Sequence, residues 1–250
     1  MNPQQKRFIE THMLWLADQF GRDVARREIA VPGSGFYPPD YSPGPAQIRS
    51  LVRRVAVRMD VDPDRIEVRF FRSRDERKTN LSNQGTTTVG RYSRSNGSEL
   101  IEIDLDHADD PALLTGIVAH ELSHARLLGE NRISSSRPKG EELTDLAAVL
   151  LGMGVFVANA SVRHKKGPQD IAVEPLGELT DVAMAIIGQG ENSFRHIGYL
   201  KAPEFGYALA CLCGLRREVD PPWAIHLHPP VRVMLRRSLA YFKQVAARVA

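Results

Sequence analysis

The apolar residues near the start of the chain recur at helical spacing. They lie three or four positions apart, at Ile9, Met13, Leu16, Phe20 and Val24. This spacing places them on one face of an amphipathic helix. Apolar residues return at the same spacing in residues 46–59, so we predict a second helix there. Residues 31–47 contain five prolines and three glycines, a composition typical of an irregular linker.

Three stretches in the next part of the chain alternate between apolar and polar residues. Residues 66–71 (IEVRFF) and 98–106 (SELIEIDLD) show the alternation clearly, and residues 86–93 (TTTVGRYS) show it weakly. Alternation combined with β-branched residues predicts strands. We expect the three strands to form a small antiparallel sheet.

Helical signals dominate from residue 110 onward. Asp110 is a candidate N-cap followed by Pro111, and Gly129 is a candidate left-handed residue after that helix. A further helix should begin near Gly140 and run through an apolar stretch, and from about residue 170 the chain should be entirely helical. A few strands followed by many helices indicate fold class α+β.

These elements divide the 250 residues into three predicted parts. Residues 1–47 form an N-terminal helix and linker. Residues 48–160 form a core that holds the sheet and two of the later helices. Residues 161–250 form a helical C-terminal subdomain.

The apolar runs, the N-terminus and the cysteines together indicate the cellular compartment of the protein. The longest apolar run, residues 146–160, has fifteen residues, fewer than the roughly 20 that cross a bilayer, and we expect a buried core helix. The N-terminus has no apolar signal region. Cys211 and Cys213 point in different directions on a predicted helix, so we expect two reduced thiols. We therefore expect a cytoplasmic protein without a membrane span.

The helix that follows Asp110 contains the sequence HELSH. His120 and His124 are four residues apart and therefore lie on one helical face, where both imidazoles can reach one zinc ion. Glu121 lies beside that face and can hold a water molecule as a general base. The apolar residues around the motif predict a mostly buried helix, in which two histidines and a glutamate need partners. We therefore predict a zinc site.

The third ligand is harder to choose. The spacing HExxHxxGxxH, which supplies a third histidine, fails at Leu127 and at Glu130. Glu130 lies just beyond the predicted helix end and is a weak candidate. Glu141 and Asp145 are four residues apart on the next helix, so Glu141 can bind the metal while Asp145 accepts the second N–H of a histidine.

Two other glutamates compete with Glu141. Glu142 is rotated about 100° away on the same helix. Glu178 belongs to a second copy of the ELTD pattern, but Gly177 stands where that copy would need the glutamate. We therefore predict Glu141 as the third ligand.

HELSH followed by EELTD resembles the motifs of the gluzincin zinc peptidases, which include thermolysin and the compact heat-shock and prenyl-protein peptidases. The resemblance covers roughly residues 98–160. It implies zinc as cofactor, a peptide or protein substrate, and an edge strand at residues 98–106 that binds extended peptide. It also implies roles by position: zinc ligands His120, His124 and Glu141, general base Glu121, and Asp145 as hydrogen-bond partner of a ligand.

A hydrolase of this kind also needs a group that stabilises the oxyanion. The candidates lie in FRHIGYL and IHLHPPVR and comprise His196, Tyr199, His226, His228 and Arg232. We select His228 and Tyr199 as the predicted catalytic pair. HPPVR resembles the His-Pro element of the heat-shock and prenyl-protein peptidases, although its spacing to the arginine differs.

The leading hypothesis is a zinc-dependent metallopeptidase. One alternative is a regulatory domain that keeps the metal without turnover, and another is a protease that acts on a DNA-associated regulator. The net charge of +3 is too small to indicate nucleic-acid binding, so we expect no nucleic-acid partner. The sequence leaves the substrate, the oligomeric state and any requirement for a partner open.

Overall fold

The structure is a computed structural model that describes residues 1–33, 35–37, 41–72, 90–95, 98–164, 194–195 and 200–249. The α-helices are α1 (Pro3–Phe20), α2 (Pro45–Arg58), α4 (Pro111–His124), α5 (Gly140–Ala148), α6 (Gly154–Ala160), α8 (Ala202–Arg216) and α9 (Pro229–Val249). Short helical turns are η1 (Arg22–Arg26), η2 (Pro63–Arg65), η3 (Leu105–His107), η4 (Ala125–Gly129), η5 (Val149–Met153) and η6 (Pro222–His226). The strands are β1 (Ile66–Phe71), β2 (Gly90–Ser95), β3 (Ser98–Asp104), β4 (Arg163–His164) and β5 (Phe194–Arg195). This arrangement confirms the α+β fold class.

The three-stranded sheet has the order β1-β3-β2. β2 and β3 are adjacent in sequence and pair antiparallel, whereas β1 pairs parallel with β3. The sheet is therefore mixed, and the expectation of an antiparallel sheet holds for one pair only. The expectation that residues 98–106 form an edge strand is wrong, because β3 hydrogen-bonds to a neighbour on each side. The edge position beside α4 belongs to β2.

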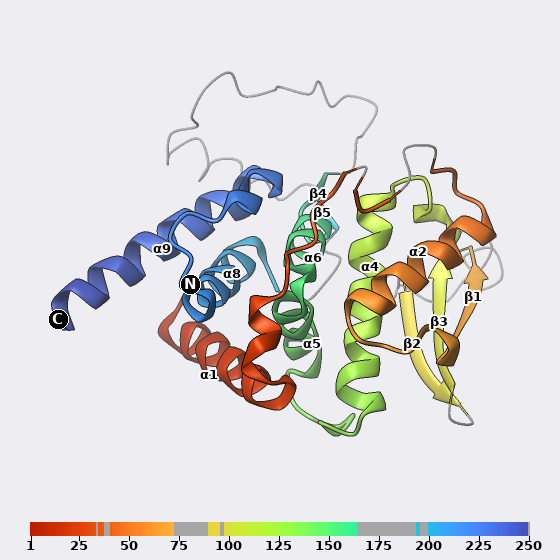
Figure 1. Ribbon diagram of the computed structural model, residues 1–250, viewed down its shortest axis with the longest axis horizontal. Helices are drawn as coiled ribbons and strands as arrows, with labels where there is room; N and C mark the ends of the chain where they lie inside the picture. The colour runs from red at the N-terminus through yellow and green to blue at the C-terminus, as the bar shows by residue number, and fades with distance from the viewer. Residues whose placement is uncertain are drawn as a thin grey trace, which may run out of the picture.

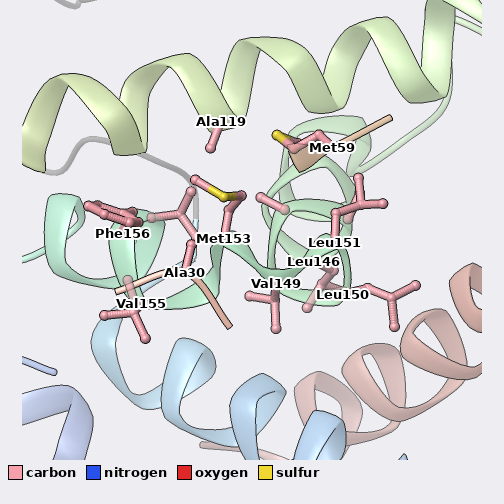
Figure 2. Packing of buried hydrophobic residues seen from close by; sticks show 14 of the residues in the cluster. Ala30, Met59, Ala119, Leu146, Val149, Leu150, Leu151, Met153, Val155 and Phe156 are labelled. Atoms are coloured by element: carbon pink, nitrogen blue, oxygen red, sulfur yellow. The ribbon is translucent and has the colours of Figure 1, made fainter. Parts of the chain in front are cut away.

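Helix α4 stands between the sheet and the α5–α6 segment (Figure 1). Its contact with α6 is close at Gly116, where an added Cβ would lie 2.8 Å from both Phe156 O and the Ala160 Cβ. Figure 2 shows Ala119 of α4 pointing toward the side chains of residues 146–156. One continuous cluster of buried side chains joins α1, α4, α5, α6 and α8. This core takes residues from all three predicted parts of the chain, and the three-part division itself stays a prediction.

The apolar helix predicted from Gly140 is confirmed, with a break in it. The span Gly140–Ala160 is long and apolar enough to cross a membrane by composition, and 94% of its most apolar window is buried inside the protein. Gly152 interrupts it with a φ of 87°. The carbonyl of Gly152 accepts the N–H of Ala30 at 2.9 Å. The break therefore ties this span to the segment after α1.

Two local expectations need correction. Gly129 is not the left-handed residue after the HELSH helix, because the helix continues through the π-helical turn η4 and the positive φ falls at Asn131. The chain after residue 170 is not entirely helical, because β5 pairs antiparallel with β4. Cys211 and Cys213 are free, as expected, and burial raises the pKa of both thiols to about 12.

Candidate metal centre

Helix α4 places both histidines of HELSH on one side. Asp110 caps the helix as predicted, since its Oδ1 accepts the N–H groups of Ala112 at 3.1 Å and Leu113 at 3.0 Å. The helix then runs unbroken to His124. The imidazole rings of His120 and His124 lie 5.0 Å apart between centroids and are nearly perpendicular. Both rings face α5.

Helix α5 brings Glu141 to these histidines. Glu141 Oε2 lies 3.3 Å from His120 Nε2 and 3.2 Å from His124 Nε2. The ligand atoms of the three residues all lie within 4.8 Å of one another. Ligands held about 2.0–2.1 Å from a tetrahedral zinc ion are about 3.3–3.4 Å apart. The two nitrogens and the carboxylate oxygen therefore form a group that could bind a metal ion.

Asp145 orients the first of the two histidines. Its Oδ1 lies 2.8 Å from His120 Nδ1. Because a carboxylate only accepts hydrogen bonds, Nδ1 carries the proton and Nε2 is left to bind the metal. The other oxygen, Oδ2, accepts the N–H of Leu200 at 2.9 Å. Asp145, which is 1% exposed, therefore links His120 to the backbone just before α8.

Thr144 is the corresponding neighbour of the second histidine. Its Oγ1 lies 3.4 Å from His124 Nδ1, and its hydroxyl donates to Gly140 O at 2.9 Å. With the hydroxyl proton used in this way, the oxygen is left to accept from Nδ1. Thr144 was not among the residues predicted from the sequence, although its position three residues after Glu141 on a helix was a usable signal.

The charges of the cluster favour a bound cation. Burial lowers the pKa of His120, but the hydrogen bond and charge of Asp145, helped by Glu141, outweigh burial and raise this pKa well above its ordinary value. The hydrogen bonds from His120 and His124 lower the pKa of Glu141. In the absence of metal, a proton on His120 therefore supplies the positive charge that Asp145 and Glu141 attract. A divalent ion would meet the same need.

Glu121 is buried beside the histidines, with 6% of its surface exposed. The backbone N–H of Tyr92 in β2 donates to its carboxylate. Gly90 packs so closely that an added Cβ would lie 2.7 Å from Glu121 Oε1. Burial raises the pKa of Glu121, while the positive charges of His120 and His124 oppose that shift. β2 therefore fixes the position of the predicted base.

Alternate residues of β2 contact α4 and the turn η4 that continues it. Gly90 faces Glu121, the Tyr92 ring stacks on His124, and the Arg94 Nη1 donates to Gly129 O at 2.6 Å. Every second residue of the strand thus meets successive turns of the helix. The alternation in residues 86–93 predicted this strand only weakly and indicated no part for it in the site.

The remaining candidates lie elsewhere or outside the described residues. Glu130 forms ion pairs with Arg126 and Arg132 and does not belong to the metal-ligand group, and neither does Glu142. The backbone N–H of His228 donates to Asn159 Oδ1 at 2.7 Å, and its proposed catalytic role stays a prediction. Further candidates lie in undescribed parts of the chain: Glu178, His196 and Tyr199.

Neither family models nor curated proteins nor solved structures give a match to this chain. The assignment of His120, His124 and Glu141 as candidate metal ligands therefore rests on the positions that their helices give these side chains. That geometry is compatible with an HExxH zinc site.

Proposed function

We propose that the protein is a zinc-dependent metallopeptidase. The observation that carries this proposal is the convergence of His120, His124 and Glu141 next to the buried carboxylate of Glu121. Two nitrogens and one carboxylate oxygen are a ligand set found in catalytic zinc sites, which keep a further position open for water or substrate. A site that served only to hold a metal would not need the additional buried carboxylate of Glu121.

Each residue of the site has a chemical role in this proposal. His120, His124 and Glu141 hold the ion, with Asp145 and Thr144 fixing the two imidazoles. Bound zinc would polarise the scissile carbonyl and increase the acidity of water. The carboxylate of Glu121 takes a proton from water and then delivers it to the leaving amine. The Tyr92 N–H keeps that carboxylate in place during both transfers.

The substrate in this proposal is an extended peptide that aligns with β2. Strand addition to an open sheet edge supplies main-chain hydrogen bonds in any sequence context. β2 has β3 as its one strand partner among the described residues, and it lies directly against α4. The substrate strand expected at residues 98–106 is therefore reassigned to the outer edge of residues 90–95.

The test is cleavage of a mixed peptide library by the zinc-loaded chain and by Glu121→Gln, with mass spectrometry as the readout. We expect Glu121→Gln to retain zinc and to lose hydrolysis, because the amide occupies the same space and cannot take a proton. Glu142→Gln is the control, since it changes a glutamate outside the metal-ligand group. Cleavage by Glu121→Gln at the wild-type rate would exclude Glu121 as the base. A wild type that binds zinc and cleaves nothing would favour the regulatory alternative.

A further inference from the structure

The two histidines of the metal centre have unequal hydrogen-bond support. His120 Nδ1 is held at 2.8 Å by the carboxylate of Asp145, whereas His124 Nδ1 meets the neutral hydroxyl of Thr144 at 3.4 Å. Hydrogen bonds to charged groups are roughly twice as strong as neutral ones and are shorter. His124 is therefore held less firmly from α5 than His120 is.

The ring of Tyr92 supplies a second contact to His124. The two rings are nearly parallel, at 19°, with their centroids 5.8 Å apart. Such an offset stack limits rotation of the imidazole about its Cβ–Cγ bond, because rotation would lose the ring contact. His120 packs against His124 edge-on instead, so His124 lies between two rings at different angles.

The Tyr92 ring is itself fixed at its far end. Its hydroxyl donates to Glu99, a carboxylate in β3 with 5% exposure. Arg65 and Arg94 each approach Glu99 to 3.8 Å and balance its charge. Gly129 closes the other side, where an added Cβ would lie 2.9 Å from both the Tyr92 hydroxyl and Glu99 Oε1. The hydroxyl thus lies between a buried carboxylate and the backbone of Gly129.

We propose that Tyr92, anchored at its hydroxyl by buried Glu99, is a positioning residue that holds the imidazole of His124 in its metal-binding orientation. The inference rests on the proposed metal centre and adds to it a support that comes from the sheet. Asp145 and Thr144 fix the histidines from α5, and Tyr92 fixes one of them from the opposite side.

The test measures Co²⁺ affinity and the visible absorption of the Co²⁺ form, which reports the geometry of the ligands. We expect Tyr92→Leu to lower affinity by about tenfold, the lower end of the range for loss of a ligand's supporting partner, and Tyr92→Phe, which keeps the ring, to lower it by about threefold. Both variants should alter the absorption bands. Glu99→Ala should resemble Tyr92→Phe, and Glu99→Gln should restore most of the affinity because its amide oxygen still accepts from the hydroxyl.

Tyr207→Phe is the matched control. Tyr207 also donates its hydroxyl to a glutamate, Glu10, and lies in the core against α9. We expect its Co²⁺ affinity and spectrum to equal those of the wild type. Unchanged affinity and spectrum in both Tyr92 variants would overturn the role of Tyr92 and leave the metal centre intact. A wild type that binds no Co²⁺ would overturn the metal centre and this inference together.

Discussion

Glu141 and Glu142 are neighbours on α5, yet only one of them meets the histidines. Glu141 lies within 3.3 Å of both imidazole Nε2 atoms, and Glu142 is outside the metal-ligand group. The difference follows from the 100° rotation per residue of an α-helix. Two glutamates in the same first turn of α5, one facing the histidines and one rotated away from them, thus provide a matched comparison.

We predict that Glu141→Ala loses most of its zinc during dialysis against a mild chelator, because the protein ligands fall from three to two. Glu142→Ala should retain about one zinc per chain. The measurement is zinc per chain in the two variants and in Glu178→Ala, which tests the second copy of the motif. If Glu178→Ala released the metal and Glu141→Ala kept it, the choice of the third ligand would be wrong.

Gly90 provides a test of how Glu121 is placed. We predict that Gly90→Ala lowers kcat by about tenfold or more and leaves the zinc content unchanged. The added Cβ would lie 2.7 Å from Glu121 Oε1 and 2.9 Å from Ile117 Cγ2, so the carboxylate must move, and small displacements of catalytic groups are costly. The measurement is peptide cleavage beside zinc content. Gly214→Ala, with open space around the glycine, is the control, and an unchanged kcat in Gly90→Ala would contradict the prediction.

At the scale of elements, the part of the site that lies on helices could be predicted from the sequence. Capping by Asp110, the four-residue spacing of the histidines and the facing pair of Glu141 and Asp145 are local properties of a helix. They depend on residues within one or two turns. The structure places the two histidines, Glu141 and Asp145 in one cluster, and Asp110 caps the start of the helix that carries the histidines.

The contribution of the sheet could not be predicted in the same way. Strand order depends on which distant segments pair, and alternation in sequence does not encode it. Because β3 is central, β2 is the strand that places Tyr92 against α4. Glu99 of β3 lies next to Gly129. Gly129 suggested a helix end by its type, but it is a glycine with no room for a Cβ. No local sequence pattern distinguishes a glycine that ends a helix from a glycine that is required because a side chain would not fit.

The crossing of α4 and α6 yields a prediction about stability. We predict that Gly116→Ala lowers the free energy of unfolding by about 1–3 kcal/mol, the usual cost of overpacking. The added Cβ would lie 2.8 Å from the Phe156 carbonyl oxygen, a backbone atom that can move only with its helix. The measurement is urea unfolding of the metal-free chain. Gly214→Ala is again the control, and equal midpoints for the two variants would show that the crossing tolerates the methyl group.

For the whole molecule, the candidate metal centre links parts of the chain that are far apart in sequence. The ligands come from α4 and α5, and Asp145 also holds the backbone of Leu200. An ion that binds only the folded chain stabilises it, by about 2.7 kcal/mol when its concentration is a hundred times Kd. Protons compete with the ion for the same imidazoles, so this stabilisation depends on pH.

The direction of that pH dependence follows from His120. The pKa of His120 in the metal-free fold is raised above its ordinary value of 6.5. The folded chain then binds more protons than the unfolded chain between 6.5 and the raised pKa. This contribution to stability is complete below 6.5 and is lost as pH rises through the raised pKa. Zinc bound at this site would bind more tightly over the same interval, because fewer protons occupy the imidazole and compete with the ion at higher pH.

We therefore predict that the difference in melting temperature between zinc-loaded and metal-free protein widens from about pH 6 to about pH 9. The measurement is thermal unfolding of both forms at constant ionic strength. Asp145→Asn is the informative variant, because it removes the charge that raises the His120 pKa and should flatten the decline of the metal-free form. Glu142→Ala should behave as the wild type does. A difference that stays constant with pH, or narrows, would mean that no proton leaves His120 when zinc binds, and His120 would then not be a ligand.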